Sequence, residues 1–284
     1  MSAAGITATA ARRSPDAAAP PATVGTAAPA PVVTALSRRK ELVVRGLVKG
    51  FPARGPVLMG VDFALLHGQS VALIGANGTG KSTFLRCCLR LTEPDSGSVR
   101  LLDTELNGLG ATALRRLRAR VGFVFQRHNL VPRLSALSNV LHGAQARHAG
   151  PRYWLHGLAP QSMREAAMHC LDQVGLADLA RQRADSLSGG QSQRVAIARM
   201  LMQEPELVFA DEPVASLDPS AGEEVMELFI DLMRRRRTTL LFTSHNLAHT
   251  VTYADRIVGL RDGRVALDES AHRCDIDGLR HLYG

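Results

Sequence analysis

A glycine-rich stretch at residues 75–83 carries the residue types that hold phosphate groups in proteins. Its glycines and its Lys-Ser-Thr ending follow the P-loop spacing, G-x-x-x-x-G-K-[ST]. Glycines let the backbone curl so that several N–H groups face one anion, and a helix that starts there adds the positive end of its dipole. We therefore expect a nucleotide phosphate to be held by Gly75, Ala76, Asn77, Gly78, Thr79, Gly80, Lys81, Ser82 and Thr83.

Two side chains of this stretch have distinct chemistry. Lys81 offers a mobile positive charge for the β- and γ-phosphates, and the Ser82 hydroxyl can ligate Mg²⁺. The alternative is a glycine-rich turn that contains a lysine by chance, and the composition disfavours it. The chain has 34 lysines and arginines, but only Lys40, Lys49 and Lys81 are lysines. A lysine here indicates a site that needs a slim ammonium rather than a planar guanidinium.

A pair of acids ends the apolar run at residues 206–212. Asp211 can hold Mg²⁺ through water, and Glu212 can act as the general base on an attacking water. The alternative is a charge pair that faces solvent at the end of a strand. A buried strand that runs straight into two acids disfavours that alternative and favours a role in phosphoryl transfer.

Two further strand ends carry candidate polar side chains. Gln126 follows the apolar residues 121–125 and can ligate Mg²⁺ or hold a water, although glutamines are commonplace at strand ends. His245 ends the run at 238–245 and can hydrogen-bond the γ-phosphate and orient water. Ligands of α/β folds bind where parallel strands end, so both side chains are expected near the phosphate loop.

A second turn suited to anions lies at residues 187–191, Leu-Ser-Gly-Gly-Gln, just before a predicted helix. One chain rarely needs two separate binding sites for one γ-phosphate. In two chains arranged head-to-tail about a two-fold axis, each nucleotide would contact one phosphate-binding site from each subunit. Upstream of the P-loop, Phe51 is either an aromatic that stacks on adenine or a core phenylalanine, and the sequence leaves both open.

The pattern of apolar runs predicts an α/β fold in which strands present these sites. The expected strands are 42–51 and 57–65 as an antiparallel pair leading to 70–74, then 98–102, 121–125, 206–212 and 238–245, with a hairpin at 256–267 about Asp262-Gly263. The expected helices are 84–90, 113–120, a helical region at 134–183 broken by a loop at 150–154, then 195–201, 221–233 and a short last helix. The only tryptophan, Trp154, lies in that loop as a docking patch or a local staple.

Composition bounds the class of protein. Residues 1–39 are rich in Ala, Pro and Thr, which predicts a disordered tail rather than a transit peptide. The net charge of +8 favours anionic partners such as nucleotides, nucleic acid or an acidic membrane surface, or reflects arginine usage alone. The spacing of the four cysteines does not match that of metal ligands, so we expect them to be buried thiols. No run reaches the roughly 18 apolar residues of a membrane helix, so we expect a cytosolic protein or one held at a membrane by a partner.

Taken in order, these motifs resemble the ATP-binding subunits of ABC transporters. The resemblance covers about residues 41–267 and rests on GANGTGKST, Gln126, LSGGQ, LVFADEP, SLD and His245. LSGGQ discriminates, because ordinary P-loop enzymes lack it. The resemblance implies a P-loop NTPase core with a mixed sheet, an N-terminal antiparallel β subdomain and an inserted helical signature subdomain. It implies a tail at 1–40, a cassette at 41–270 with its helical subdomain at about 127–190, and a last helix at 271–284.

The resemblance also implies ligands and partners. In that family, Ser188, Gly190 and Gln191 would contact ATP bound to the other subunit, and Asp218 would lie across the dimer interface. Gln126 and the helical subdomain would couple to membrane-spanning permease subunits, and Phe51 would stack on adenine. The expected cofactors are ATP and Mg²⁺. The expected partners are a second copy of the chain, the permease and, indirectly, a solute-binding protein, at the cytoplasmic face of the inner membrane.

Within this family the chain looks most similar to phosphonate importers, at residues 125–131, 139–143, 211–219 and 253–263, including Val214 where many relatives carry threonine. Two features depart from the family pattern: the long tail, and Ser192 where relatives often have glutamine. One rival function is import of another solute, such as amino acids or phosphate. The other is a soluble ABC-type ATPase acting on nucleic acid or ribosomes, which the basic charge invites. A single cassette without long heptads or zinc spacing disfavours this rival, so no nucleic-acid partner is expected.

Overall fold

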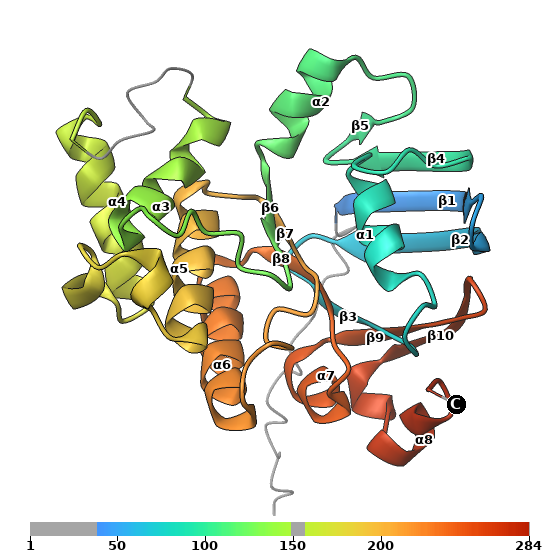
Figure 1. Cartoon of the computed structure of the whole chain (residues 1–284). Helices are drawn as coiled ribbons and strands as arrows, with labels where there is room; N and C mark the ends of the chain where they lie inside the picture. Colours follow the sequence, from blue (N-terminus) through green and yellow to red (C-terminus); the bar gives the residue numbers. More distant parts are fainter. Residues whose placement is uncertain (1–38, 149–156, 284) are drawn as a thin grey trace, which may run out of the picture. The chain divides into compact units, whose positions relative to one another are not determined.

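The computed structural model describes residues 39–148 and 157–283, which form two sheets with helices around them (Figure 1). The first sheet has the strand order β2-β1-β4-β5, with β1 at Lys40–Phe51, β2 at Gly55–Leu66, β4 at Ser96–Leu101 and β5 at Thr104–Glu105. The second has the order β10-β9-β3-β8-β7-β6, with β3 at Ser70–Ile74, β6 at Val121–Val124, β7 at Leu207–Ala210, β8 at Thr239–Thr243, β9 at Arg256–Arg261 and β10 at Arg264–Ser270.

The helices connect and cover these strands (Figure 1). They are α1 at Lys81–Cys88, α2 at Ala111–Arg118, α3 at Ala136–Leu141, α4 at Gln161–Gln173, α5 at Gly189–Met202, α6 at Pro219–Arg236, α7 at Leu247–Tyr253 and α8 at Ile276–Arg280. Single 3-10 turns lie at His142–Ala146, Ala177–Leu179, Ala184–Ser186 and Ala271–Arg273. Within the described ranges, no helix is long and apolar enough to cross a membrane.

The second sheet is mixed, as expected. Its strands β9, β3, β8, β7 and β6 run parallel, and β10 pairs antiparallel with β9 across the predicted hairpin at Asp262 and Gly263. Every residue of β7 and of β8 is buried, which is typical of parallel strands covered on both faces. The carboxyl ends of β3, β6, β7 and β8 therefore meet at one edge, and the candidate site residues follow those ends.

Alternating residues of the central strands enter two different core clusters, as the period of two in a strand requires. In β3, Ala72 and Ile74 join the cluster that contains residues of α5 and α6, whereas Val71 and Leu73 join the cluster that contains α1 and the first sheet. The sheet that carries the site is therefore held between two apolar layers. This support keeps the strand ends in fixed relative positions.

The structure corrects several boundaries predicted from the sequence. The antiparallel strands β1 and β2 are present and precede β3 as predicted, and the structure adds that β1 also pairs with β4 in a sheet separate from that of β3. In the described parts of 134–183 the region contains α3 and α4, as a helical region broken in the middle predicts, together with single 3-10 turns, while the predicted loop at 150–154 lies outside the described residues. Helix α5 begins at Gly189, so the Ser-Gly-Gly-Gln turn is its first turn. Helix α7 was not predicted, and Trp154 lies outside the described residues, as does the tail up to residue 38.

Candidate nucleotide-binding site

The glycines of residues 75–83 adopt conformations that other residues avoid. Gly75, Gly78 and Gly80 have φ angles of +142°, +86° and +102°. A Cβ atom on Gly75 would lie 2.3 Å from the carbonyl oxygen of Leu260, which leaves no room for a side chain. Gly80 is the residue that precedes helix α1, so the loop delivers the chain directly into a helix N-terminus. The observed strand, loop and helix are the context that phosphate binding by this motif requires.

Lys81 is buried inside this loop. Its Nζ atom donates hydrogen bonds to the carbonyl oxygens of Gly75 at 2.7 Å and Ala76 at 3.0 Å. Burial lowers the pKa of Lys81, and the charges of Glu212 and Asp211 partly offset that effect. The loop thus holds an ammonium group among backbone amides, where a phosphate oxygen could replace the carbonyl oxygens as its partner.

A network of hydroxyls and a carboxylate joins the ends of β7 and β8 to the start of α1. The hydroxyl of Ser82 and the hydroxyl of Thr243 both donate to Asp211 Oδ1, each at 3.0 Å. The backbone N–H of Glu212 donates to Thr243 Oγ1 at 2.8 Å. The structure therefore brings Ser82 and Asp211 together, as the motifs predicted. Thr243 was missed, although a hydroxyl at the last residue of a strand beside the two acids was the available signal.

Glu212 is held in an unusual conformation at the end of β7. Its φ angle is +50°, a left-handed value that costs free energy in a residue with a side chain. One of its carboxylate oxygens, Oε1, contacts His245 Nε2. The side chain is 15% exposed in Glu212 and 33% exposed in His245, so the pair is shielded but reachable by water. The two residues predicted to be catalytic are therefore in direct contact.

A cavity of about 490 Å³ opens over the P-loop. The connection between β1 and β2 forms one wall, and Glu212 forms part of another. Phe51 lines this cavity, with the Lys49 ammonium 5.3 Å from the centre of its ring. Phe51 is thus placed where an adenine could stack, and it is only partly buried rather than part of the core. Arg54 also lines the cavity and was not predicted from the sequence.

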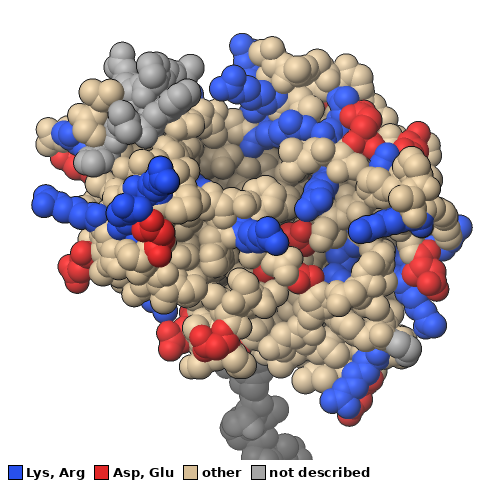
Figure 2. All heavy atoms as spheres, viewed as in Figure 1, with Lys and Arg blue, Asp and Glu red and all other residues tan. Residues whose placement is uncertain are grey.

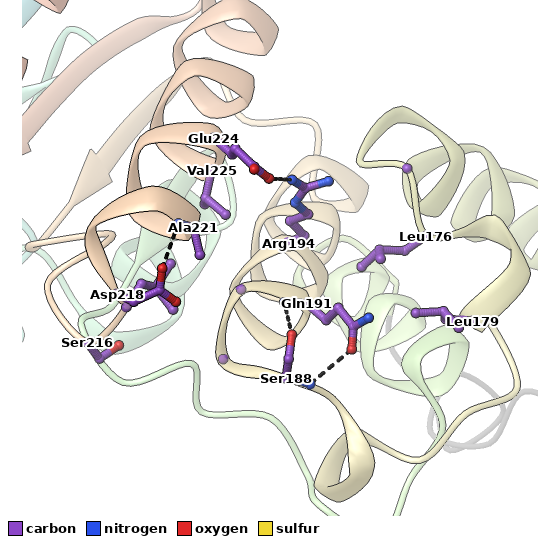
Figure 3. A pocket seen from close by; sticks show the side chains of 14 residues that line it. Leu176, Leu179, Ser188, Gln191, Arg194, Ser216, Asp218, Ala221, Glu224 and Val225 are labelled. Carbon is purple, nitrogen blue, oxygen red and sulfur yellow. Dashed lines mark hydrogen bonds and ion pairs between the residues drawn. The ribbon is translucent and has the colours of Figure 1, made fainter.

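The Ser-Gly-Gly-Gln turn lies in a different cavity, of about 580 Å³ (Figure 3). Ser188 Oγ accepts a hydrogen bond from the N–H of Gln191 at 3.2 Å, and Gln191 Oε1 accepts one from the N–H of Ser188 at 2.9 Å. This capping box starts α5. Asp218 caps the neighbouring helix α6, and Figure 3 shows it beside the start of α5. No P-loop residue lines this cavity, so within one copy the turn does not reach the P-loop.

A third cavity, of about 470 Å³, lies between these two sites. Glu212 lines both this cavity and the one over the P-loop, and Asp218 lines both this cavity and the one at the Ser-Gly-Gly-Gln turn. His245 faces the same space. Glu212, the candidate general base, and Asp218 therefore line the same cavity.

Gln126 is a further predicted site residue that lies outside the P-loop cavity. It is exposed after β6 and is not among the residues that line the P-loop cavity. The loop that follows it is attached to α5, because Arg199 donates to the carbonyl oxygens of Asn129 at 2.7 Å and His128 at 2.8 Å. Arg199 was not singled out from the sequence, in which it is one arginine among many.

A groove of about 420 Å³ lies beside this loop, between α2 and the turn after α3. The space-filling view shows the hollow, with Lys and Arg side chains along its α2 side (Figure 2). Its apolar lining includes Leu91, which is 48% exposed, and the stacked rings of Phe123 and Phe125, whose centres are 4.2 Å apart.

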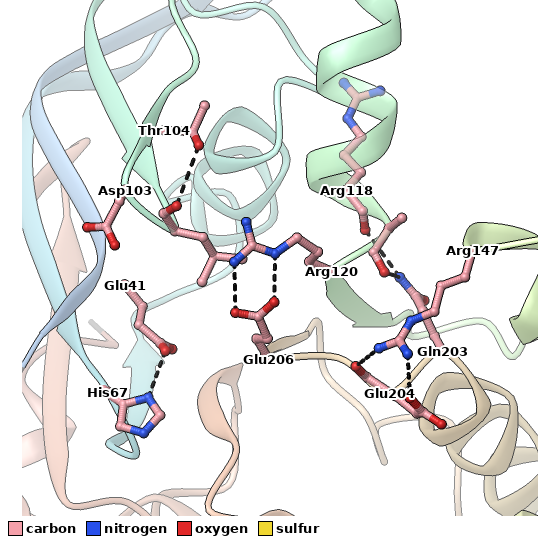
Figure 4. Close-up of polar contacts among 12 residues, drawn as sticks. Glu41, His67, Asp103, Thr104, Arg118, Arg120, Arg147, Gln203, Glu204 and Glu206 are labelled. Carbon is pink, nitrogen blue, oxygen red and sulfur yellow. Dashed lines mark hydrogen bonds and ion pairs between the residues drawn. The ribbon is translucent and has the colours of Figure 1, made fainter.

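Polar contacts hold the walls of this groove together (Figure 4). The amide of Gln203, in the residue after α5, donates to the carbonyl oxygens of Arg118, Ala119 and Val121 at 3.2, 3.0 and 2.8 Å. Arg120 makes a two-pronged pair with Glu206, at 2.6 and 2.8 Å. The contacts of Gln203 thus attach the C-terminal end of α5 to the end of α2 and the start of β6.

His128 gives the loop a testable pH dependence. Burial, with the nearby Arg199 charge, lowers the pKa of His128 from 6.5. The unfolded chain then binds a proton at this residue more readily than the folded chain does. Its contribution to the free energy of unfolding is therefore fully present above about pH 6.5 and is lost as pH falls toward the lowered pKa. We expect His128→Gln to reduce the drop in Tm between about pH 7.5 and about pH 5.5.

The matched control is His272→Gln, which changes an exposed histidine in the described C-terminal part of the chain. It is expected to leave the acid-side drop in Tm as it is in the parent. Equal drops in the parent and in His128→Gln would show that His128 does not contribute to the pH dependence.

Comparison with known proteins agrees with this geometry. The family model described as ABC transporter matches residues 58–215. The chain is 43% identical over 245 residues to the phosphonates import ATP-binding protein PhnC of Nitratidesulfovibrio vulgaris, covering 86% of this chain and 92% of that protein. It is 46% identical over 223 residues to the PhnC protein of Nocardia farcinica, covering 78% and 83% of the two chains.

Solved structures show the same fold. The chain resembles the ATP-binding cassette MJ0796, in a dimeric post-hydrolysis state bound to ADP and Pi, with a TM-score of 0.71 and 32% identity. The match covers 81% of this chain and 98% of that one. CbiO1 of Clostridium perfringens, part of the transporter complex cbiONQ, matches with a TM-score of 0.71 and 26% identity over 82% and 89% of the two chains.

Proposed function

This chain belongs to the ABC transporter family as an ATP-binding subunit, and from that membership we propose that it hydrolyses ATP to energise import of phosphonates or related organophosphorus anions. One observation carries the proposal. Within one copy, the P-loop and Glu212 line one cavity, whereas the Ser-Gly-Gly-Gln turn lines another. The identity to phosphonate import proteins over most of the chain supports the solute.

ATP would bind with its triphosphate in the P-loop and its adenine against Phe51. The backbone N–H groups of the loop and Lys81 would hold the phosphates, and Arg54 at the cavity wall would add positive charge. Ser82 and Asp211 would hold Mg²⁺, because they place a hydroxyl and a carboxylate oxygen 3.0 Å apart. Water and phosphate oxygens would supply the remaining ligands, as is usual for Mg²⁺. The bound ion would neutralise charge that develops on the phosphates.

Hydrolysis would use Glu212 and His245 together. Glu212 would accept a proton from a water whose oxygen attacks the γ-phosphorus, while the bond from that phosphorus to the ADP oxygen breaks. The contact between His245 Nε2 and Glu212 Oε1 would aim the carboxylate. Gln126 would approach the γ-phosphate or Mg²⁺ only after a movement of its loop, since it is exposed and outside the cavity here.

A second copy of the chain would complete each site. Ser188, Gly190 and Gln191 lie at the start of α5, where N–H groups and the helix dipole favour an anion. Because these residues lie outside the P-loop cavity of their own copy, they would contact the γ-phosphate of ATP held by the partner. Asp218 would lie at the interface between the copies. The dimeric state of the similar cassette MJ0796 supports this arrangement.

The groove beside Gln126 would receive a segment of the permease. Its apolar lining and exposed Leu91 suit an amphipathic helix end, and the arginines of α2 suit acidic residues on that segment. A shift there would reach α5 through Gln203 and Arg199. The chain would thus sit at the cytoplasmic face of the inner membrane, with a solute-binding protein acting on the far side. The cassette would span 41–270, with its helical part at about 127–190, a tail at 1–40 and the last segment at 271–284.

A growth experiment tests the proposed solute. A strain that lacks this gene is supplied with a phosphonate or with inorganic phosphate as its sole phosphorus source. We expect growth to fail on the phosphonate alone, and to return with the parental gene but not with a Lys81→Ala gene. Normal growth on the phosphonate together with lost uptake of another solute would favour an importer for that solute. A salt-dependent shift of DNA or RNA at physiological ionic strength would instead favour an ATPase acting on nucleic acid.

A further inference from the structure

The segment after α8 is anchored beside the catalytic strand ends. Leu279 and Leu282 are 2% and 3% exposed and belong to the core cluster that also contains residues of α5 and α6. Leu282 fills the space over Gly259 of β9, where an added Cβ would lie 2.6 Å from its Cδ1 atom. Tyr283 follows directly, so its position is set by a packed neighbour rather than by a free chain.

Tyr283 touches both the P-loop and the turn that carries His245. Its hydroxyl donates to the carbonyl oxygen of Ser244 at 3.1 Å. The backbone of Gly75, the first P-loop residue, lies near the same hydroxyl. The ring of Tyr283 meets the ring of His245 at 6.3 Å between centres, with 66° between their planes. This edge-to-face arrangement is a favourable one for aromatic rings.

The turn at residues 244–246 is short, and its two ends are fixed. It begins after Thr243, whose hydroxyl binds Asp211, and it ends at Asn246, whose side chain caps α7. Ser244 Oγ accepts a hydrogen bond from the N–H of Asn246 at 3.0 Å. The peptide between Ser244 and His245 sets the direction of the imidazole, and its carbonyl oxygen is the one that Tyr283 binds.

We propose that Tyr283 is a positioning residue for ATP hydrolysis, which holds the imidazole of His245 so that Nε2 meets the carboxylate of Glu212. The hydroxyl fixes the peptide before His245, and the ring limits rotation of the imidazole. Tyr283 does not line the P-loop cavity, so it acts through His245 and not on ATP. Burial and the nearby Glu212 charge raise the pKa of Tyr283, so its hydroxyl keeps the proton that it donates.

This inference rests on the proposed role of His245, and the test separates the two. The full chain, assembled with its transmembrane partners, is compared with Tyr283→Phe, Tyr283→Ala, His245→Ala and the double variant Tyr283→Ala/His245→Ala. His281→Ala, an exposed neighbour in the same segment, is the matched control. The measurements are kcat and KM for ATP, the Kd for ATP and Tm.

We expect Tyr283→Phe to lower kcat about fivefold, the rate equivalent of one neutral hydrogen bond, and Tyr283→Ala to lower it about tenfold or more. The Kd for ATP should stay within about twofold, because the ground-state phosphate contacts are intact. In the His245→Ala background, Tyr283→Ala should cause no further loss, since the group that it positions is gone. His281→Ala should match the parent.

Three results would overturn the inference. The first is a parental kcat in Tyr283→Ala. The second is a loss that adds fully to that of His245→Ala, which a general weakening of the fold would produce. The third is a parental kcat in His245→Ala, which would remove the histidine's role as well. The general-base role of Glu212 is judged separately by its own variant, so either proposal can fail without the other.

Discussion

Replacing Glu212 by glutamine is expected to lower kcat for ATP hydrolysis by about 10²- to 10⁴-fold, the range for loss of a general base. The amide keeps the size of the side chain and can still meet His245 Nε2, but it cannot accept a proton from water. The phosphate contacts come from the P-loop and Lys81 and are unchanged. ATP should therefore bind with nearly parental Kd by calorimetry, while steady-state phosphate release almost stops.

Retained ATP without hydrolysis should also trap the two-copy state. We expect Glu212→Gln with ATP to elute as a dimer in size-exclusion chromatography, and an added Ser188→Arg to abolish that dimer, because a long side chain would occupy the γ-phosphate position. Glu227→Gln, an exposed acid on α6, is the control and should keep parental turnover. Hydrolysis at the parental rate in Glu212→Gln would exclude Glu212 as the base.

Replacing Lys81 by alanine is expected to weaken ATP binding by about 100-fold. A charged hydrogen bond to phosphate is worth about 1.5–3 kcal/mol, and Lys81 can make more than one. The hydrogen bonds of its Nζ atom go to carbonyl oxygens of its own loop, so we expect the fold to lose little stability when the side chain is removed. Calorimetry should show the weaker Kd, and Tm without nucleotide should stay close to the parental value.

Lys40 is the matched control, because it is an exposed lysine at the start of β1, away from the P-loop cavity. Lys40→Ala should bind ATP as the parent does. Parental affinity in Lys81→Ala would contradict the phosphate role. A large fall in Tm without nucleotide would instead show that Lys81 supports the loop itself, and would require a new account of its burial.

The local motifs could be predicted from the sequence because their geometry is local. A left-handed loop needs glycine, and a helix that starts at once after it supplies N–H groups, so residues 75–83 specify their own shape. The Ser188 and Gln191 capping box likewise lies within four residues. Strands β7 and β8 are buried on both faces, so they consist largely of apolar residues and can be predicted from the sequence. A parallel sheet then brings their carboxyl ends together.

Contacts between distant segments could not be predicted in the same way. Thr243 lies 32 residues from Asp211, and Tyr283 lies 39 residues from Ser244. Nothing in the spacing distinguishes Arg199 from the other arginines until its guanidinium is seen on the loop after Gln126. Side-chain types at such positions are common, and only packing selects which of them meet.

The sequence by itself determined that this chain binds a nucleotide phosphate, which acids follow β7 and which turn begins α5. Each of these depends on backbone conformations within a few consecutive residues. Only the tertiary structure decided that Glu212 meets His245, that the Tyr283 hydroxyl binds the carbonyl oxygen of Ser244, and that the Ser-Gly-Gly-Gln turn stays outside its own P-loop cavity. Those contacts depend on the packing of two apolar layers, which fixes the strand ends relative to one another. This packing joins segments far apart in the sequence, so no short stretch of residues predicts it.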